Sequence, residues 1–291
     1  MEVKKLLIAG LPGSGKTTFL AALWHVVESE EVEDSLVISE VHGVRDHLNL
    51  IREQWLNCQE LERTKISAEK LVSFRLRDRT NNKVVEVTLP DLSGETFRHQ
   101  WESRQWTAEF DALASQSSGV ALFIHPRTVI EPTRIDSGTA AMMDALSPES
   151  VALSRGDAPG TNSELAINPW SATETCTQVK LVEILQFLKN RAFVGLPLPV
   201  AIVISAWDLI KDESTPPSWL QKRLPLLDQF LKANVESLPF QVFGVSALGD
   251  ELAQAASLQK HDKASDRIIV TETAEKASHD ITIPLKWLLG R

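Results

Sequence analysis

The sequence contains little cysteine and no long apolar run, and each shortage excludes a class of protein. Its two cysteines, Cys58 and Cys176, lie far apart in 291 residues. We therefore expect neither a disulfide framework nor a cysteine-based metal site, and a reducing compartment suits the chain. No apolar stretch is long enough to cross a bilayer, and the first apolar run is too short for a secretory signal. We expect a cytoplasmic protein without a transmembrane segment.

Positive charge is also in short supply. The chain has 30 lysines and arginines against 39 aspartates and glutamates, which gives a formal net charge of −9. Nucleic acids and anionic membranes select basic surfaces, so we expect neither as a partner. The histidines do not occur at zinc-binding spacings with nearby partners. With 43% hydrophobic residues, a chain of this length can bury a sizeable core, and one or two domains are expected.

The clearest motif lies within residues 3–18. An apolar run over residues 3–9 predicts a buried strand, and residues 18–28 carry apolar side chains at helical spacing. Between them, residues 10–17 match the phosphate-binding pattern G-x-x-x-x-G-K-[ST]. The motif is therefore placed between a strand and a helix, which is the context that its chemistry needs.

The residue types in this motif suit phosphate binding. Gly10, Gly13 and Gly15 allow backbone N–H groups to point at phosphate oxygens, and the start of the helix adds its positive end. Lys16 supplies a charge for the β and γ phosphates, and the hydroxyl of Thr17 is the expected Mg²⁺ ligand. We assign nucleotide binding here to Pro12, Gly13, Ser14, Gly15, Lys16, Thr17 and Thr18.

A second motif follows a predicted hairpin. Residues 71–77 and 84–89 alternate apolar and polar side chains, with a Thr-Asn-Asn turn between them, so they predict an antiparallel pair of strands. The second strand runs directly into D-x-x-G, whose ends are Asp91 and Gly94. A carboxylate at a strand's C-terminal end can hold Mg²⁺, usually through water, and the glycine lets its N–H approach a γ-phosphate.

The rest of the chain alternates apolar segments with polar ones. We expect a short strand or buried turn over residues 36–41, buried strands over 119–125, 198–205 and 240–245, and helices over 44–61, 100–117, 175–189, 219–233 and 283–289. Residues 126–172 are polar and predict an insertion, either a tolerated loop or a partner-binding lid. Residues 249–278 predict a variable segment, either a second insertion or a frayed helix.

Four motifs now stand in order at strand ends: the phosphate loop, D-x-x-G, S-A-W-D at residues 205–208 and S-A-L at residues 246–248. This order resembles the Ras-like GTPases of the TRAFAC class, and most of all the bacterial double-GTPase-type families linked to prokaryotic conflict systems. The resemblance implies one α/β P-loop GTPase domain over residues 1–291. Its twisted, mostly parallel sheet has one antiparallel strand, residues 71–77, and helices on both faces, with the nucleotide at the C-terminal edge of the strands.

The resemblance also implies which residues read the base. Asp208 matches the aspartate of the N-K-x-D motif, whose carboxylate accepts from guanine N1–H and N2–H₂. Ser205 stands where Asn or Thr is usual, and Ala206 departs from the usual Lys. Two interpretations are open for Trp207, a flat surface that replaces the missing lysine or a core residue. The family's S-A-K motif, in which the alanine N–H reaches guanine O6, is matched here by Ser246, Ala247 and Leu248.

For Mg²⁺ the resemblance implies three protein ligands. Thr17 and Asp91 are two of them. The third is a switch I threonine before the strand at residue 71, for which we choose Thr64 over Ser67, with an ordinary loop residue as the alternative interpretation.

Catalysis would fall to Lys16, Thr64 and the residue after D-x-x-G. That residue is Glu95, where Ras-like enzymes keep a water-orienting Gln. Its carboxylate could orient water or act as a base, but it would be repelled by the γ-phosphate, so slow intrinsic hydrolysis is expected. Arg98 and Arg104 could add positive charge in cis, or be solvated surface residues.

These features predict an Mg²⁺-dependent GTP-binding and GTP-hydrolysing switch that acts on a protein effector or activator. Its switch regions lie near residues 60–67 and 91–105. A non-catalytic or very slow GTP/GDP-binding scaffold is the alternative that Glu95 and Ala206 favour, and a P-loop ATPase is the second alternative. The resemblance is compatible with a nucleotide-dependent dimer and suggests a role in bacterial defence.

Overall fold

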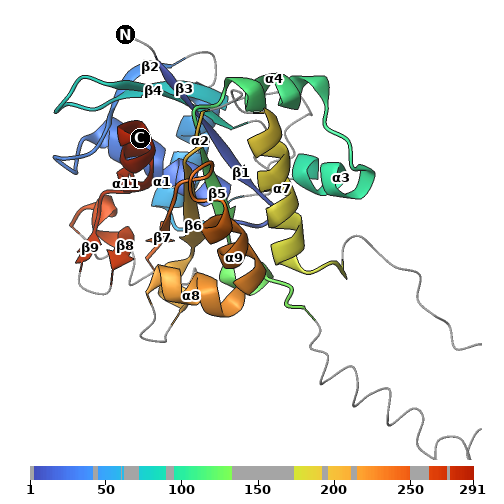
Figure 1. Ribbon diagram of the computed structural model, residues 1–291. Coiled ribbons are helices and arrows are strands. Elements are labelled where there is room, and N and C mark those ends of the chain that lie inside the picture. The colour runs from blue at the N-terminus through green and yellow to red at the C-terminus, as the bar shows by residue number, and fades with distance from the viewer. Residues whose placement is uncertain are drawn as a thin grey trace, which may run out of the picture.

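The computed structural model describes most of the chain. The described residues are 3–41, 45–59, 61, 72–89, 95–132, 174–191, 196–210, 215–249, 262–273 and 276–291. They form one nine-stranded sheet with helices on both faces (Figure 1). Within these ranges, no helix combines the length and the apolar character needed to cross a membrane.

The sheet has the order β2-β3-β4-β1-β5-β6-β7-β8-β9. β4, β1, β5, β6 and β7 are parallel neighbours, whereas β3 and β8 run against the others. The strand bounds are β1 Lys4–Gly10, β2 Val37–Val41, β3 Val72–Arg77, β4 Val84–Leu89, β5 Gly119–Ile124, β6 Val200–Ser205, β7 Phe240–Ser246, β8 Ile269–Thr273 and β9 Lys276–Ser278. The mostly parallel α/β fold and the reversed strand at 72–77 are confirmed, and β8 is a second reversed strand.

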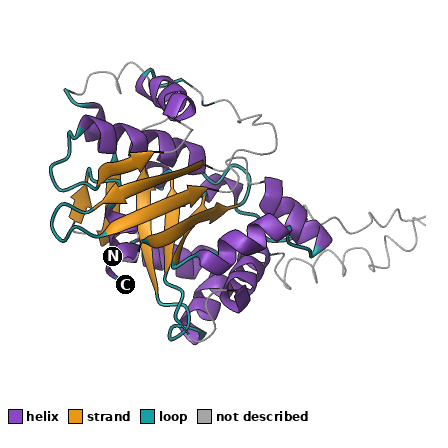
Figure 2. Cartoon of the chain, turned by 90° about the horizontal axis from the view of Figure 1, so that it is seen from above, coloured by secondary structure: helices purple, strands orange, loops and turns teal. Residues whose placement is uncertain are grey.

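Two layers of helices cover the sheet, as the view from above shows (Figure 2). One face carries α1 Lys16–Ser29, α2 Arg45–Leu56 and the C-terminal α11 Ile283–Gly290. The other face carries α3 Glu95–Ser103, α4 Ala108–Gln116, α7 Thr177–Arg191, α8 Pro216–Arg223 and α9 Pro225–Ala233. This arrangement leaves the C-terminal edge of the parallel strands between the layers.

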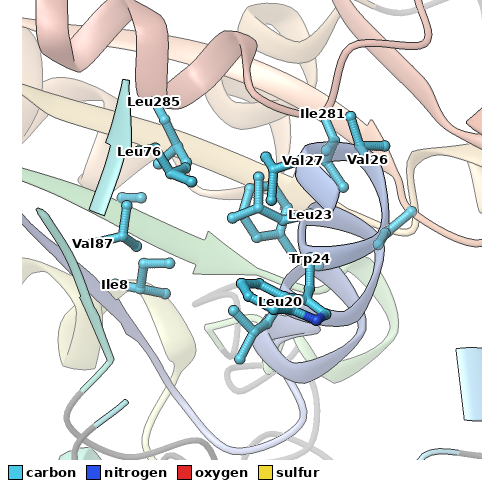
Figure 3. Close-up of a cluster of buried hydrophobic side chains, with 14 of the residues drawn as sticks. Ile8, Leu20, Leu23, Trp24, Val26, Val27, Leu76, Val87, Ile281 and Leu285 are labelled. Atoms are coloured by element: carbon cyan, nitrogen blue, oxygen red, sulfur yellow. The ribbon is translucent and has the colours of Figure 1, made fainter. Parts of the chain in front are cut away.

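Alternation along the buried strands builds both cores. In β1, Leu6 and Ile8 belong to the cluster under α1, whereas Leu7 and Ala9 belong to the opposite cluster, because successive strand residues point to opposite faces. Strands that are buried on both faces therefore read as continuous apolar runs. Figure 3 shows the first cluster, in which α1 contributes Leu20, Leu23, Trp24, Val26 and Val27 against side chains of β1, β3, β4 and α11.

The hairpin of β3 and β4 is confirmed, and its turn is closed by one carboxylate. Asp78 accepts hydrogen bonds from Thr80 N at 2.8 Å, Thr80 Oγ1 at 2.6 Å and Asn81 Nδ2 at 2.8 Å. These bonds lower the pKa of Asp78 against the opposing effect of burial, which is the largest single influence on it. Asn82 takes a positive φ of 57°, as residues of tight turns do.

Two predicted helices are each split in the structure. The helix expected over 100–117 is two helices, because Arg104 has a φ of 56° and Thr107 caps the second helix by accepting from Phe110 N at 3.2 Å. The helix expected over 219–233 divides at Pro225, which cannot continue the first helix and begins the second.

The variable segment predicted at 249–278 is partly regular, so a frayed helix is wrong for its described part, and an insertion stays a prediction. A 3₁₀ turn over Ala264–Arg267 precedes β8, which pairs with β7, and β9 completes the edge. The insertion predicted at 126–172 lies outside the described residues from 133 onward. Its described beginning is a 3₁₀ turn over Pro126–Thr128.

Candidate functional site

The loop after β1 has the backbone shape that its glycines allow. Gly13 and Gly15 have φ values of 71° and 89°, in the left-handed region that glycine enters without steric cost. Gly15 is the N-cap of α1 and provides no side-chain cap. The backbone N–H groups at the start of α1 are therefore not occupied by a capping side chain, and the positive end of the helix is directed at the loop.

The ammonium group of Lys16 lies inside this loop. The side chain is 2% exposed, and its Nζ donates to the carbonyl oxygens of Gly10 at 2.8 Å and Leu11 at 3.2 Å. It also lies 3.4 Å from the Ser14 hydroxyl oxygen. A buried charge needs such partners, and the group is placed where an anion on the loop would meet a positive charge.

Ser205, at the end of β6, ties this loop to the sheet. Its hydroxyl donates to the carbonyl oxygen of Ser14 in the phosphate loop at 2.8 Å, and the carbonyl oxygen of Ile124 lies within reach at 3.3 Å. A Cβ at Gly15 would lie 2.7 Å from the same Oγ. The close approach of strand and loop therefore depends on glycine at position 15.

The chain turns sharply after Ser205. Ala206 is left-handed, with φ 47° and ψ 46°, and leads into a 3₁₀ turn over Trp207–Leu209. The indole of Trp207 packs against β7, where a Cβ on Gly244 would lie 2.4 Å from Trp207 Cδ2. It also packs on the core cluster of the face that α7, α8 and α9 cover. Asp208 instead lines the cavity described next.

A cavity of about 410 Å³ lies at the C-terminal edge of the sheet and reaches from the loop to this turn. Phe19 and Phe123, whose rings meet edge to face at 4.8 Å, form part of its apolar wall. The cavity brings together residues from the ends of β5, β6 and β7 and from the start of α1. Its lining is Gly15, Thr18, Phe19, Phe123, His125, Arg127, Ser205, Ala206, Asp208, Leu209, Val245, Ala247 and Leu248.

Sequence reasoning missed two polar members of this lining, His125 and Arg127. They follow β5, so the position just past the C-terminal end of a strand, which pointed to Asp91, applies to them as well. Burial and the charge of Arg127 lower the pKa of His125, although Asp208 acts in the opposite direction. The imidazole is therefore neutral at pH 7, and its Nδ1 accepts from Arg127 N at 3.2 Å.

The turn after β7 reaches the cavity through Ala247 and Leu248. Ser246 is fully buried, and its hydroxyl oxygen accepts from Gly249 N at 3.0 Å. Its side chain therefore holds the turn in shape and does not line the cavity.

The comparison with protein families gives one result. The family model described as Double-GTPase 1 matches residues 7–288. The chain belongs to the Double-GTPase 1 family. The match spans the phosphate loop, the turn with Asp208 and the turn after β7, so family membership supports a GTP-binding switch.

Several solved structures are similar to this Double-GTPase 1 chain. A bacterial selenocysteine-specific elongation factor is 12% identical, with a TM-score of 0.41, and the match covers 88% of this chain and 28% of that one. A small GTPase of Trypanosoma brucei with a bound nucleotide analogue is 13% identical, with a TM-score of 0.37, and the match covers 91% of this chain and 99% of that one. A chain of the signal recognition particle receptor complex of Chaetomium thermophilum is 14% identical, with a TM-score of 0.39, and the match covers 86% of this chain and 93% of that one. A search of curated proteins finds no match.

Three predicted site residues lie outside the described part of the chain: Thr64, Asp91 and Gly94. Glu95 begins α3, but its side chain is not among those described. Ser67, the alternative switch I residue, also lies outside the described part of the chain.

The two arginines near α3 have partners on the surface. Arg98 lies 3.9 Å from Glu102. Arg104 pairs with Glu183 of α7, and its guanidinium lies 3.8 Å from the centre of the Trp101 ring. In this conformation Arg104 therefore braces α3 against α7.

A magnesium ion would be held by oxygen ligands, and Thr17 is the described residue that fits. It follows Lys16 in the first turn of α1, beside the loop where phosphate oxygens would complete a hard-cation site. Among the described residues, no three His, Cys, Asp or Glu side chains gather as metal ligands. From the described part of the chain, the Thr17 hydroxyl is therefore the side-chain ligand that such a site would take.

The tie between Ser205 and the loop can be tested by Ser205→Ala. The variant should lose about 1 kcal/mol of stability, as expected for one hydrogen bond, and should bind GDP several-fold more weakly because the loop is no longer held. Thermal melting and calorimetric titration of GDP measure the two effects.

Ser117→Ala is the matched control. Ser117 is a buried serine whose hydroxyl donates to the Leu113 carbonyl at 2.8 Å, and it lies before β5 at the opposite edge of the sheet. It should lose similar stability and keep its GDP affinity. Equal GDP affinity in Ser205→Ala and wild type would show that the tie does not shape the phosphate site.

Proposed function

We propose that the chain is a guanine-nucleotide switch that binds GTP and GDP in the cavity between the phosphate loop and Asp208. One observation carries the proposal: the loop that holds the buried Lys16 and the carboxylate of Asp208 meet at the same cavity, joined by Ser205. The first group suits phosphates, and the second suits a base with two neighbouring donors. Membership of the Double-GTPase 1 family supports the same function.

At the phosphate end, Lys16 and the N–H groups of the loop would bind the β and γ phosphates. These donors are held in place before a ligand arrives, so little reorganisation is needed when negative charge develops in the transition state. When bound, Mg²⁺ would neutralise phosphate charge, and we propose that Thr17, Thr64 and Asp91 hold it, directly or through water.

At the base end, the carboxylate of Asp208 would accept from guanine N1–H and N2–H₂. Adenine lacks this donor pair, which argues against an ATPase. The apolar lining, including Leu209 and Leu248, suits the faces of a planar base. Trp207 packs on Gly244, so it is proposed as a support for the turn, with no contact to the base.

We further propose slow hydrolysis that depends on a protein partner. Glu95 stands at the start of α3, where its carboxylate would orient the attacking water but would also be repelled by the γ-phosphate. The segments near 60–67 and 91–105 would be ordered by the γ-phosphate and relax after hydrolysis. A protein effector, or a second copy in a nucleotide-dependent dimer, would read that difference.

Base reading is tested by Asp208→Asn. An asparagine keeps one acceptor and gains a donor, so it should lose guanine and accept xanthine, which presents a carbonyl in place of the 2-amino group. We expect GTP affinity to fall about ten-fold or more, since hydrogen bonds to charged groups contribute about 1.5–3 kcal/mol, and XTP affinity to rise. Competition titrations of GTP, XTP and ATP measure this.

Asp228→Asn is the control for that exchange. Asp228 is buried in α9 and pairs with Lys232 at 2.8 Å, and it is not part of the cavity lining. Its variant should keep the wild-type order of nucleotides. If Asp208→Asn also keeps that order, or if wild type binds ATP as well as GTP, the guanine assignment is wrong.

Single-turnover hydrolysis separates the switch from the scaffold. With protein in excess over GTP and Mg²⁺ present, wild type should release phosphate slowly, and Glu95→Gln should be faster because a negative charge beside the γ-phosphate is removed. Lys16→Ala should abolish release. If neither wild type nor Glu95→Gln releases phosphate although both bind GTP, the protein is a non-catalytic scaffold.

A further inference from the structure

A buried tryptophan of α2 holds the backbone of the turn after β7. Trp55 is 1% exposed, and its indole N–H donates to the carbonyl oxygen of Ala247 at 2.8 Å. Ala247 lines the candidate nucleotide cavity. α2 is thus bonded directly to the turn after β7, which forms the end of the candidate site opposite the phosphate loop.

The guanidinium of Arg267 supports the indole. Arg267 is 3% exposed, its Cζ lies 4.2 Å from the centre of the Trp55 ring, and its Nη1 donates to Cys58 Sγ at 2.8 Å. The Arg267 carbonyl also crowds the turn, because a Cβ at Gly249 would lie 2.5 Å from it, and Gly249 has a φ of 96°. The turn after β7 therefore lies between α2 and the 3₁₀ turn that precedes β8, with little room to change shape.

The same indole contacts α1, the helix that begins at the phosphate loop. The His25 ring lies 5.2 Å from the Trp55 ring, centre to centre. Arg52 Nε lies 3.2 Å from His25 Nδ1, and His25 Nε2 lies 3.2 Å from a Glu31 carboxylate oxygen. Burial lowers the pKa of His25 against the opposing effect of Glu31. A neutral ring that accepts at Nδ1 and donates from Nε2 satisfies both bonds.

We propose that Trp55 is a positioning residue for guanine. By holding the Ala247 carbonyl, it limits rotation about the Cα–C bond of Ala247 and so keeps the turn in the shape that presents the Ala247 N–H, the group that would meet guanine O6. The inference rests on the proposed guanine-nucleotide function and adds to it a second determinant of base choice, beyond Asp208. It also places that determinant on α2, which leads toward the segment at 60–67 proposed as switch I.

The chain offers a matched control in Trp24. Its indole N–H donates to Asn49 Oδ1 at 2.9 Å across the same α1–α2 interface, and the side chain is fully buried. Trp24 packs on Phe74, with ring centres 5.9 Å apart, and not on the turn after β7. Trp24→Phe and Trp55→Phe therefore remove the same chemical group from the same interface, and only the second frees the Ala247 carbonyl.

The test is the ratio of GDP to ADP affinity, measured by calorimetry for wild type, Trp55→Phe and Trp24→Phe, with melting temperatures for all three. Trp55→Phe should bind GDP about ten-fold more weakly, the effect of about one hydrogen bond, with ADP affinity little changed, so the ratio falls. Trp24→Phe should melt earlier and keep the wild-type ratio.

Equal ratios in the two variants would overturn the proposal, because Trp55 would then be a structural residue only. If Trp55→Phe does not fold, replacement of Trp55 with 3-benzothienylalanine keeps the two-ring shape and removes only the N–H donor. A wild-type ratio in that protein would also overturn the proposal. A wild type without any guanine preference would instead contradict the proposed function itself, which keeps the two failures apart.

Discussion

A buried ammonium group holds the phosphate loop in shape, and the rest of the site is built on that loop. Lys16 is almost without solvent contact and is bonded to the carbonyls of Gly10 and Leu11. Burying a charge is costly unless it is hydrogen-bonded, so the loop must curl around the lysine, and the glycines make that curl available. A bound phosphate would add the opposite charge to a group that is already in position.

The sheet determines what can lie near this loop. β1, β5, β6 and β7 are parallel neighbours, so their C-terminal ends deliver the loop, His125, Asp208 and the turn after β7 to one edge. Direct contacts then join these pieces. Ser205 bonds the loop from β6, and Trp55 bonds the Ala247 carbonyl from α2, so both ends of the cavity are braced by buried side chains.

Local patterns in the sequence predicted the buried strands, the hairpin and the phosphate loop, because those patterns report burial and backbone geometry directly. The resemblance to Ras-like GTPases pointed to Asp208 and Ala247 at the other end of the cavity. Features that depend on partners distant in sequence were missed. β8 is short and mixed in polarity, and it is a strand because the edge of β7 needs a partner. Arg127 reaches the cavity through a turn that no periodicity marks, and the role of Trp207 depends on Gly244 in another strand.

The most direct measurement is a crystal structure of the protein with GDP and Mg²⁺. We expect the β-phosphate on the N–H groups of Gly13 to Lys16 and in contact with the Lys16 ammonium, with the guanine edge within hydrogen-bonding distance of the Asp208 carboxylate. A nucleotide bound elsewhere, or one whose phosphates occupy the loop while the base turns away from Asp208, would contradict this expectation.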